Sequence, residues 1–370
     1  MLLTLISFRG RFNYTNLSRY SDLNEKTYRR QFGKNLDFIE FNRIGNSEII
    51  PVSATLIAAL DCSFVGKSGD KTYGLGKFWD SKQGKAEKGL EISTLALIDV
   101  DYNTAYHVST RQTPPEAKEG ETRVNDHVRH FQKDYHALPK SVRYIVTDAY
   151  YSKSLITNAI LEEGYDQIGK LRCDANLRYL YTGEQKPKGR PKKYDGKMVI
   201  GEISHLDFAG VSEDGTKVYT AIVNCVNLKR DIRIAYLVKN TASGSRFALL
   251  FSTDTTLNAL LIYKYYKARF QIEFLFRDAK QFTGLCDCQA RSEKALHSHF
   301  NASFAALNLI KWHDRELSPN RKPISIGSWK TRFFNELLIE RIFCNFGFDL
   351  SLIKSSSSYE ELCNFGVVSF

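Results

Sequence analysis

The sequence has little of the material from which disulfide frameworks and zinc sites are built. Its seven cysteines are an odd number, and no two of them have the Cys-x-x-Cys spacing of a structural zinc site. Only one residue separates Cys286 from Cys288, and no second cysteine pair is present to complete such a site. We therefore expect free thiols, which are typical of a reducing cytoplasm.

Long apolar runs are also missing. The longest lies around residues 49–60 and is well under the ~20 residues that a membrane-spanning helix needs. The opening run, MLLTLIS, is shorter still and has no charged segment before it. These absences argue against membrane proteins and disulfide-rich secreted domains, and they predict a soluble protein.

The sequence does contain an ordinary globular composition with an excess of positive charge. Its 370 residues, 43% hydrophobic and 25% charged, are enough for two or three domains with at least one sizeable core. The formal net charge of +11 favours a polyanionic partner, and nucleic acid is the first candidate.

The N-terminal residues 12–32 have the pattern of two short helices around a turn. The first helix, 17–20, has Thr15 or Asn16 as its candidate cap, and Asn24 can cap the second, 25–32. The second helix carries Arg29 and Arg30, side chains that recognition helices use on phosphates and base edges. A helix-turn-helix that binds DNA and an ordinary helical hairpin with a basic surface both fit this pattern.

A compact α/β unit is expected next. The expected strands are 54–60, 91–100, 103–110, 141–147 and 166–171, the expected helices are 122–135 and 151–163, and 66–88 reads as a loop. Asp61 and Asp148 then follow the ends of two buried strands. Ligands of open α/β sheets gather at the carboxyl ends of the strands, so we expect these carboxylates at one site.

Residues 176–250 have a different pattern, that of a small antiparallel β insertion with expected strands at 198–206, 216–226 and 231–239. The segment 186–193, KPKGRPKK, has five basic residues in eight, among them Arg190, Lys192 and Lys193. Such a segment can lie along a phosphate backbone or can be a solvated loop.

The segment 266–280, YKARFQIEFLFRDAK, predicts a helix of four turns with two different faces. One stripe holds a phenol, three cations and one carboxylate: Tyr266, Arg269, Glu273, Arg277 and Lys280. The opposite stripe holds Ala268, Ile272, Phe276 and Ala279 and is expected to face a core. Taken alone, the charged stripe also fits a solvated helix face.

Asp61, Asp148 and Glu273 together suggest a metal site. Mg²⁺ or Mn²⁺ takes carboxylate oxygens together with water and phosphate oxygens, and two such ions can activate an attacking oxygen and stabilise the leaving one. Asp99, which closes another expected strand, is the reserve candidate for Asp61.

The spacing Tyr266-x2-Arg269-x3-Glu273-x6-Lys280 makes this constellation specific. It resembles the YREK signature of bacterial insertion-sequence DDE transposases of the IS-four type. Asp61 in ALDCSF and Asp148 in VTDAYYSK are similar to the first and second catalytic aspartates of that family. The 125 residues from Asp148 to Glu273 also fit a β domain inserted before the glutamate helix.

The resemblance implies an RNase H-like core that performs cut-and-paste transposition. Asp61, Asp148 and Glu273 would hold two Mg²⁺ or Mn²⁺ ions, cleave the terminal inverted repeats and transfer 3′-hydroxyls to target DNA. Tyr266, Arg269 and Lys280 would hold the end phosphates while a hairpin forms on the transposon end, and Arg277 on the same stripe is a further candidate for DNA binding. The implied protein is a homodimer that joins two ends in the bacterial cytoplasm, on the nucleoid.

The expected organisation has five parts: a helical DNA-binding segment 1–45, core 46–175, β insertion 176–250, core 251–315 and helical tail 316–370, with a helix at 329–344. Relatives usually have more chain before the helix-turn-helix, so a truncated N-terminus is also expected. Two other functions stay open. One is an inactive or truncated protein that binds transposon ends, and the other is a different RNase H-like nuclease, such as a resolvase or a repair enzyme.

Overall fold

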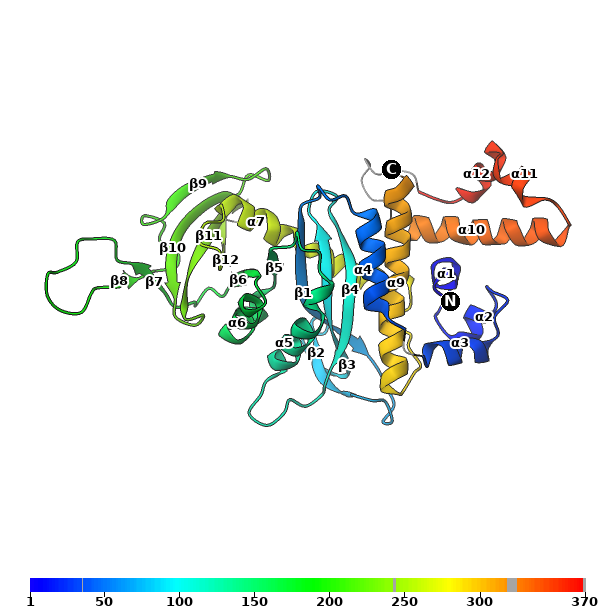
Figure 1. Ribbon diagram of the computed structural model, residues 1–370, viewed down its shortest axis with the longest axis horizontal. Coiled ribbons are helices and arrows are strands. Elements are labelled where there is room, and N and C mark those ends of the chain that lie inside the picture. Colours follow the sequence, from blue (N-terminus) through cyan, green and yellow to red (C-terminus); the bar gives the residue numbers. More distant parts are fainter. Residues whose placement is uncertain (35, 242–243, 318–324, 369–370) are drawn as a thin grey trace. The chain divides into compact units, whose positions relative to one another are not determined.

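The computed structural model describes residues 1–34, 36–241, 244–317 and 325–368 (Figure 1). The chain divides into two compact units. The first comprises Met1–Ala54, Cys62–Glu116 and Gln271–Phe370, and the second comprises Thr55–Asp61 and Ala117–Phe270. Strand β1 (Leu56–Gly66) and helix α8 (Phe270–Phe282) each belong partly to both. Each unit is described by itself.

Three parallel strands organise the second unit. The first half of β1 pairs with β5 (Tyr144–Val146), with Ala58 opposite Ile145 and Ala59 opposite Val146, and β5 pairs with β6 (Asp166–Leu171). Helices α5 (Arg123–Asp134) and α6 (Ser154–Glu162) pack against each other, and α6 also packs on β6. Short 3-10 helices lie at Tyr135–Ala137 and Ala149–Tyr151. The expected strands at 141–147 and 166–171 and helices at 122–135 and 151–163 are therefore confirmed, with β5 shorter than expected.

The sheet of the second unit continues through antiparallel strands in the order β6-β12-β11-β10-β7-β8, and β9 pairs with β10. These strands are β7 (Leu177–Leu180), β8 (Tyr194–Lys197), β9 (Asp207–Val211), β10 (Lys217–Cys225), β11 (Arg230–Thr241) and β12 (Gly244–Ser252). Helix α7 (Ala259–Ala268) packs on β11 and β12.

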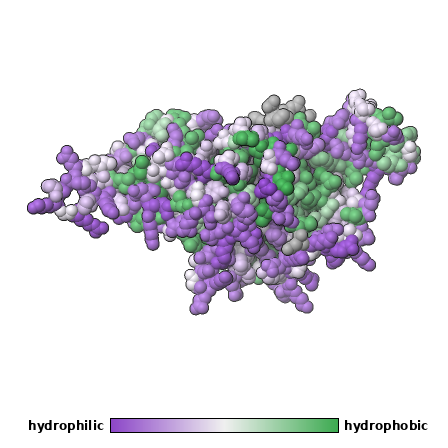
Figure 2. Space-filling model, in the orientation of Figure 1, coloured by the Kyte–Doolittle hydropathy of each residue, from purple (hydrophilic) through white to green (hydrophobic). Residues whose placement is uncertain are grey.

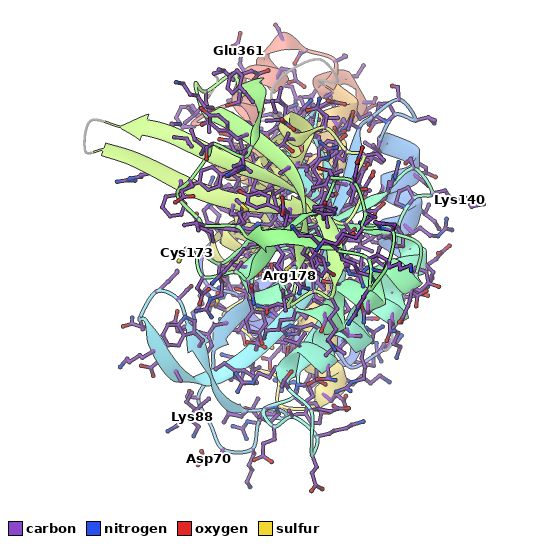
Figure 3. All side chains as sticks on the ribbon, turned by 90° about the vertical axis from the view of Figure 1, so that its left-hand side faces the viewer. Asp70, Lys88, Lys140, Cys173, Arg178 and Glu361 are labelled. Atoms are coloured by element: carbon purple, nitrogen blue, oxygen red, sulfur yellow. The ribbon has the colours of Figure 1, made fainter. Side chains whose placement is uncertain are left out.

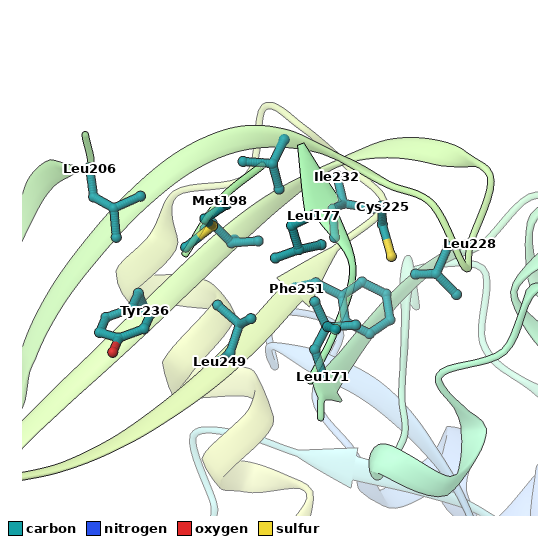
Figure 4. Packing of buried hydrophobic residues seen from close by; sticks show 13 residues of the cluster. Leu171, Leu177, Met198, Leu206, Cys225, Leu228, Ile232, Tyr236, Leu249 and Phe251 are labelled. Atoms are coloured by element: carbon teal, nitrogen blue, oxygen red, sulfur yellow. The ribbon is translucent and has the colours of Figure 1, made fainter. Parts of the chain in front are cut away.

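A core of its own holds this antiparallel part together. Leu177, Met198 and Phe251 are fully or almost fully buried in a cluster drawn from the strands and the turns between them (Figure 4). The predicted strand at 198–206 is wrong, because residues 198–206 form turns between β8 and β9 and Gly201 has a φ of +112°. Met198 and Leu206 nevertheless reach the core from these turns.

The first unit is built on a long antiparallel hairpin. β3 (Lys85–Asp99) pairs with β2 (Gly76–Asp80) and with β4 (Thr104–Thr113). The expected strands at 91–100 and 103–110 are confirmed, whereas the expected loop at 66–88 is wrong because it contains β2 and the start of β3. Gly89 of β3 lies so close to the second half of β1 that an added Cβ would be 2.6 Å from the carbonyl oxygen of Val65.

Helices cover the hairpin of the first unit. α4 (Phe38–Ile49) and α9 (Glu293–Leu317) pack on β4 and on each other (Figure 1). The remaining helices are α1 (Leu2–Ser7), α2 (Tyr14–Ser18), α3 (Glu25–Phe32), α10 (Ile326–Asn345), α11 (Leu350–Lys354) and α12 (Ser357–Cys363). The helix expected at 329–344 corresponds to α10. None of the described helices combines the length and the apolar character that crossing a membrane requires.

The helix expected over 266–280 is split in two at Arg269. α7 ends at Ala268 and α8 begins at Phe270. The backbone N–H of Arg269 is shared between the carbonyl oxygens of Tyr265 and Tyr266, each at 3.2 Å, which tightens the last turn of α7. The apolar stripe is as predicted, since Ala268, Ile272, Phe276 and Ala279 are all buried.

Candidate active site

Asp61 lies on β1, and Asp148 follows the neighbouring parallel strand β5 by two residues, both in the second unit. The parallel register of β1 and β5 ends with Ala59 opposite Val146. Continued by two residues, it sets Asp61 opposite Asp148. The prediction that Asp61 follows the end of its strand is wrong, because β1 continues to Gly66. Asp148 does follow its strand, where it caps the 3-10 helix by accepting a 2.9 Å hydrogen bond from the Tyr150 N–H.

Arg269 forms an ion pair with Asp61 within the second unit. Its Nη1 lies 3.2 Å from Oδ2 of Asp61, and the two side chains are only 6% and 15% exposed. The guanidinium also lies over the rings of Tyr266 and Phe270, 5.5 and 5.3 Å from their centres. A buried carboxylate needs a counter-charge, and Arg269 supplies one to Asp61.

Lys280 contacts the other half of β1, within the first unit. Its ammonium donates to Oγ of Ser63 at 2.8 Å and to the carbonyl oxygen of Phe64 at 2.9 Å. Burial lowers the pKa of Lys280. The segment from Arg269 to Lys280 therefore contacts β1 at both of its ends, through Arg269 at Asp61 and through Lys280 at Ser63.

Glu273 lies between Arg269 and Lys280 in the sequence, on the exposed side of the first turn of α8. A carboxylate there is favoured by the positive end of the helix dipole. Arg277, one turn further, is exposed and donates to Oδ1 of Asp278 at 2.9 Å, with its guanidinium 4.7 Å from the centre of the Phe274 ring. Of the predicted stripe, Arg269 and Lys280 are thus engaged with β1, and Glu273 and Arg277 lie at the surface.

The reserve candidate Asp99 has a structural role. It is fully buried in the first unit, and its Oδ2 lies 2.6 Å from Nη1 of Arg315. Its Oδ1 accepts hydrogen bonds from the N–H groups of Asp101 and Tyr102, which fixes the turn between β3 and β4. This carboxylate is occupied by the fold on both oxygens.

The N-terminal pair α2–α3 has the expected helices with one different cap. Asn24 caps α3 as predicted, but Asn13 caps α2 in place of Thr15 or Asn16, because α2 begins earlier, at Tyr14. On α3, Arg30 is exposed, and Arg29 forms a 2.6 Å ion pair with Glu25.

The basic segment at 186–193 lies in the connection between β7 and β8. Arg190 and Lys193 are exposed, and the region is hydrophilic at one end of Figure 2. Lys192 forms a 2.6 Å ion pair with Asp195 and lies 4.4 Å from the centre of the Tyr181 ring. Two of the three predicted contacts with DNA thus extend into solvent.

Sequence reasoning missed the side chains that position the predicted ones. Ser63 is part of the ALDCSF motif, but only the fold shows that it receives Lys280. Its partner is 217 residues away, so no local pattern could have indicated the contact.

The family model for the transposase DDE domain matches residues 55–309, which is more than half of the chain. The match begins immediately before β1 and ends within α9, so it contains Asp61, Asp148, Glu273 and Lys280. No curated protein matches the sequence. The chain is a member of the transposase DDE-domain family.

Proposed function

We propose that this transposase moves an insertion sequence of the IS-four type by cut-and-paste, with Asp61, Asp148 and Glu273 as its catalytic carboxylates. The observation that carries the proposal is the parallel pairing of β1, which carries Asp61, with β5, which Asp148 follows, together with the ion pair between Arg269 and Asp61. Glu273 is assigned from the YREK spacing and from its place between the two contacts with β1.

The donor set fits a divalent cation. Members of this family generally use divalent metal ions, and three carboxylates are hard oxygen donors of the kind that Mg²⁺ and Mn²⁺ take. Two such ions, when bound, would polarise the scissile phosphate and acidify the attacking water or 3′-hydroxyl. Asp61 is partly exposed and Glu273 is exposed, so neither is closed off by the core of its unit.

The remaining YREK side chains hold DNA phosphates in this proposal. Lys280 supplies a point charge fixed by two hydrogen bonds, which positions a phosphate without reading sequence. Arg269 lies against both Asp61 and the Tyr266 ring, and in this proposal it orients the carboxylate beside the DNA phosphates. Arg277, Arg29, Arg30, Arg190, Lys192 and Lys193 extend the basic contact with DNA.

The architecture supports an RNase H-like core within the expected domain organisation. β3 pairs with β2 and β4 in antiparallel fashion, and β1 pairs with β5 and β5 with β6 in parallel. The antiparallel strands β7–β12 then form the insertion before the glutamate helix. We further propose a homodimer that joins two transposon ends, hairpin ends as the cleavage intermediate and α2–α3 as the element that recognises the ends.

Strand cleavage by the purified full-length protein tests the proposal. The substrate is the DNA that flanks the gene, with Mg²⁺ or with EDTA. The matched variants are Asp148→Ala and Asp174→Ala, because Asp174 is an exposed aspartate of the same unit that pairs only with its neighbour Arg172. We expect cuts at an inverted repeat that require metal and Asp148 but not Asp174.

Two outcomes would contradict the proposal in different ways. Binding of the inverted repeats without any metal-dependent cut would identify an inactive end-binding protein. Cleavage of branched or damaged DNA together with indifference to inverted repeats would identify another RNase H-like nuclease.

A further inference from the structure

A basic cleft of about 760 Å³ lies within the first unit, outside the proposed catalytic residues. Its walls come from the N-terminal segment, from the connection between β1 and β2, and from the segment that joins α8 to α9. The charged residues among those that line it are Arg11, Arg29, Lys67, Arg291 and Asp287. Four cations and one carboxylate thus line the cleft, and one of the cations, Arg29, is already paired with Glu25 outside the lining.

The one carboxylate of the lining is already neutralised. Asp287 accepts from Nε of Arg11 at 3.1 Å with Oδ1 and from the backbone N–H of Phe12 at 3.1 Å with Oδ2. It holds the N-terminal segment against the connection between α8 and α9. The charges of Lys67 and Arg291 are not balanced by it.

Lys67 and Arg291 repel each other across the cleft. The Lys67 ammonium donates to the carbonyl oxygen of Cys288, so its position is fixed. Burial lowers the pKa of Lys67; the Cys288 thiol opposes this effect and Arg291 adds to it. Both side chains line the same cleft, and two like charges on the walls of one cleft favour an anion within it.

The cleft connects two features to which the proposed function already assigns DNA. Arg29 belongs to α3, the second helix of the N-terminal pair, and Cys286 lies near enough to Lys280 to influence its pKa. The hydroxyls of Ser68, Thr72 and Tyr14 also line the cleft, and hydroxyl groups are common donors to backbone phosphates.

We propose that this cleft binds the phosphate backbone of duplex DNA between α3 and the end of α8, with Lys67 and Arg291 as its principal contacts. The inference rests on the proposed function, because it supplies a path for the DNA whose end is cut. The spread of the four cations over three chain segments favours successive phosphates of one backbone over a single small anion.

Thiol protection tests the proposal on the unmodified full-length protein. Cys286 lines the cleft and is exposed, while Cys173 in the second unit (labelled in Figure 3) and Cys344 on α10 are exposed elsewhere. The rates of alkylation of the three thiols are measured by mass spectrometry in EDTA, with and without a saturating duplex of arbitrary sequence. We expect the duplex to slow Cys286 severalfold and to leave Cys173 and Cys344 unchanged.

Two results of this measurement would overturn the proposal. Equal alkylation of Cys286 with and without the duplex would show that DNA does not enter the cleft. Slowing by inorganic phosphate that matches the slowing by DNA would show a site for small anions instead.

Charge removal gives a second readout. In the variant Lys67→Gln/Arg291→Gln we expect duplex affinity at about 0.1 M salt to fall roughly tenfold or more, and the slope of log K against log salt to shrink by about 2. The control, Lys133→Gln/Lys140→Gln, removes the same charge from two exposed lysines of the second unit (Lys140 is labelled in Figure 3). Equal losses in both variants would contradict the proposal, and thermal melting shows that each variant is folded.

These readouts separate this proposal from the proposed function because binding is measured without metal. Cleavage that survives Asp148→Ala, together with protection of Cys286, would refute the catalytic assignment and leave the cleft. Cleavage that depends on Asp148, together with unprotected Cys286, would refute the cleft alone.

Discussion

Two aspartate–arginine pairs, one in each unit, show how differently the same side chains can be used. In the first unit, Asp99 and Arg315 are 2.6 Å apart and essentially buried, and both oxygens of Asp99 also serve the fold. In the second unit, Asp61 and Arg269 are 3.2 Å apart, and Asp61 is 15% exposed opposite Asp148. The Asp99–Arg315 pair stabilises a turn, whereas the Asp61–Arg269 pair orients a carboxylate that stays partly exposed.

The difference lies in what completes each site. Asp99 finds its full set of donors inside the first unit, so nothing further is required. Asp61 and Asp148 belong to neighbouring paired strands, and like charges on neighbouring strands are costly unless a cation lies between them. A pair of carboxylates held in this way is therefore typical of a site for a metal ion, whereas a closed pair is typical of structure.

Among the substitutions that test this comparison, Asp61→Asn should have the largest effect on cleavage. We expect metal-dependent cleavage to fall by about 10³-fold or more, because the substitution removes a charge from the proposed metal site while keeping the shape of the side chain. The free energy of unfolding, measured in urea, should change far less than for the same substitution at Asp99. Cleavage at the normal rate by folded Asp61→Asn would contradict the proposal that Asp61 is a catalytic carboxylate.

Asp99→Asn should show the opposite behaviour. It leaves the Arg315 guanidinium buried without its carboxylate, so the free energy of unfolding should fall by about 3–5 kcal/mol. Cleavage per folded molecule should be retained, provided that the assay is run at a temperature where the variant is folded. A stable but inactive Asp99→Asn would give Asp99 a role at the site that the described contacts do not suggest.

His299 extends the comparison to a buried histidine, in which burial favours the neutral ring. Burial lowers its pKa to about 4; its Nε2 lies 3.0 Å from the carbonyl oxygen of Gly284. The unfolded chain takes up a proton near pH 6.5 and the folded chain does not. The free energy of unfolding should therefore fall as the pH drops from about 6.5 towards 4, and this part of the fall should be absent in His299→Phe.

Urea unfolding of the wild type and of His299→Phe at several pH values between about 7 and 4 measures this difference. His136→Gln, which changes an exposed histidine, is the control. An unchanged pH dependence in His299→Phe would show that the buried ring does not resist protonation.

Ser63→Ala gives the smallest expected effect. It removes one of the two hydrogen bonds that fix the Lys280 ammonium, and the bond to the Phe64 carbonyl remains. We expect a loss of about 1 kcal/mol in stability and a few-fold lower cleavage, measured by urea unfolding and by initial cleavage rates. The control Ser81→Ala changes an exposed serine of the first unit that lies outside the cleft. An effect as large as that of Asp61→Asn would mean that Ser63 acts in the reaction itself.

The sequence predicted much of the fold where the signal is local. Strand-like runs predicted β3 and β4, and the apolar stripe of Ile272 and Phe276 predicted the buried face of α8. The hairpin of β2 and early β3 was missed because only Phe78 of β2 is buried, so its polar composition is that of a loop.

Contacts between distant residues set the limit of what could be predicted for the site. The break at Arg269 accompanies its ion pair with Asp61, 208 residues earlier, and no helix propensity indicates it. The role of Asp99 depends on Arg315, 216 residues later. The residue types of the proposed site were readable from the YREK spacing, but the choice between Asp61 and Asp99 needed the fold.

The most direct test of the central claim is whether one metal ion is held by Asp61, Asp148 and Glu273 together. Fe²⁺ in place of Mg²⁺, with ascorbate and peroxide, generates radicals that cut the backbone beside the bound ion, and mass spectrometry locates the cuts in the full-length protein. We predict cuts near residues 61, 148 and 273. An excess of Mg²⁺ should suppress all three cuts, and Asp148→Ala should abolish them. Cuts near 61 and 148 without any near 273 would contradict this prediction.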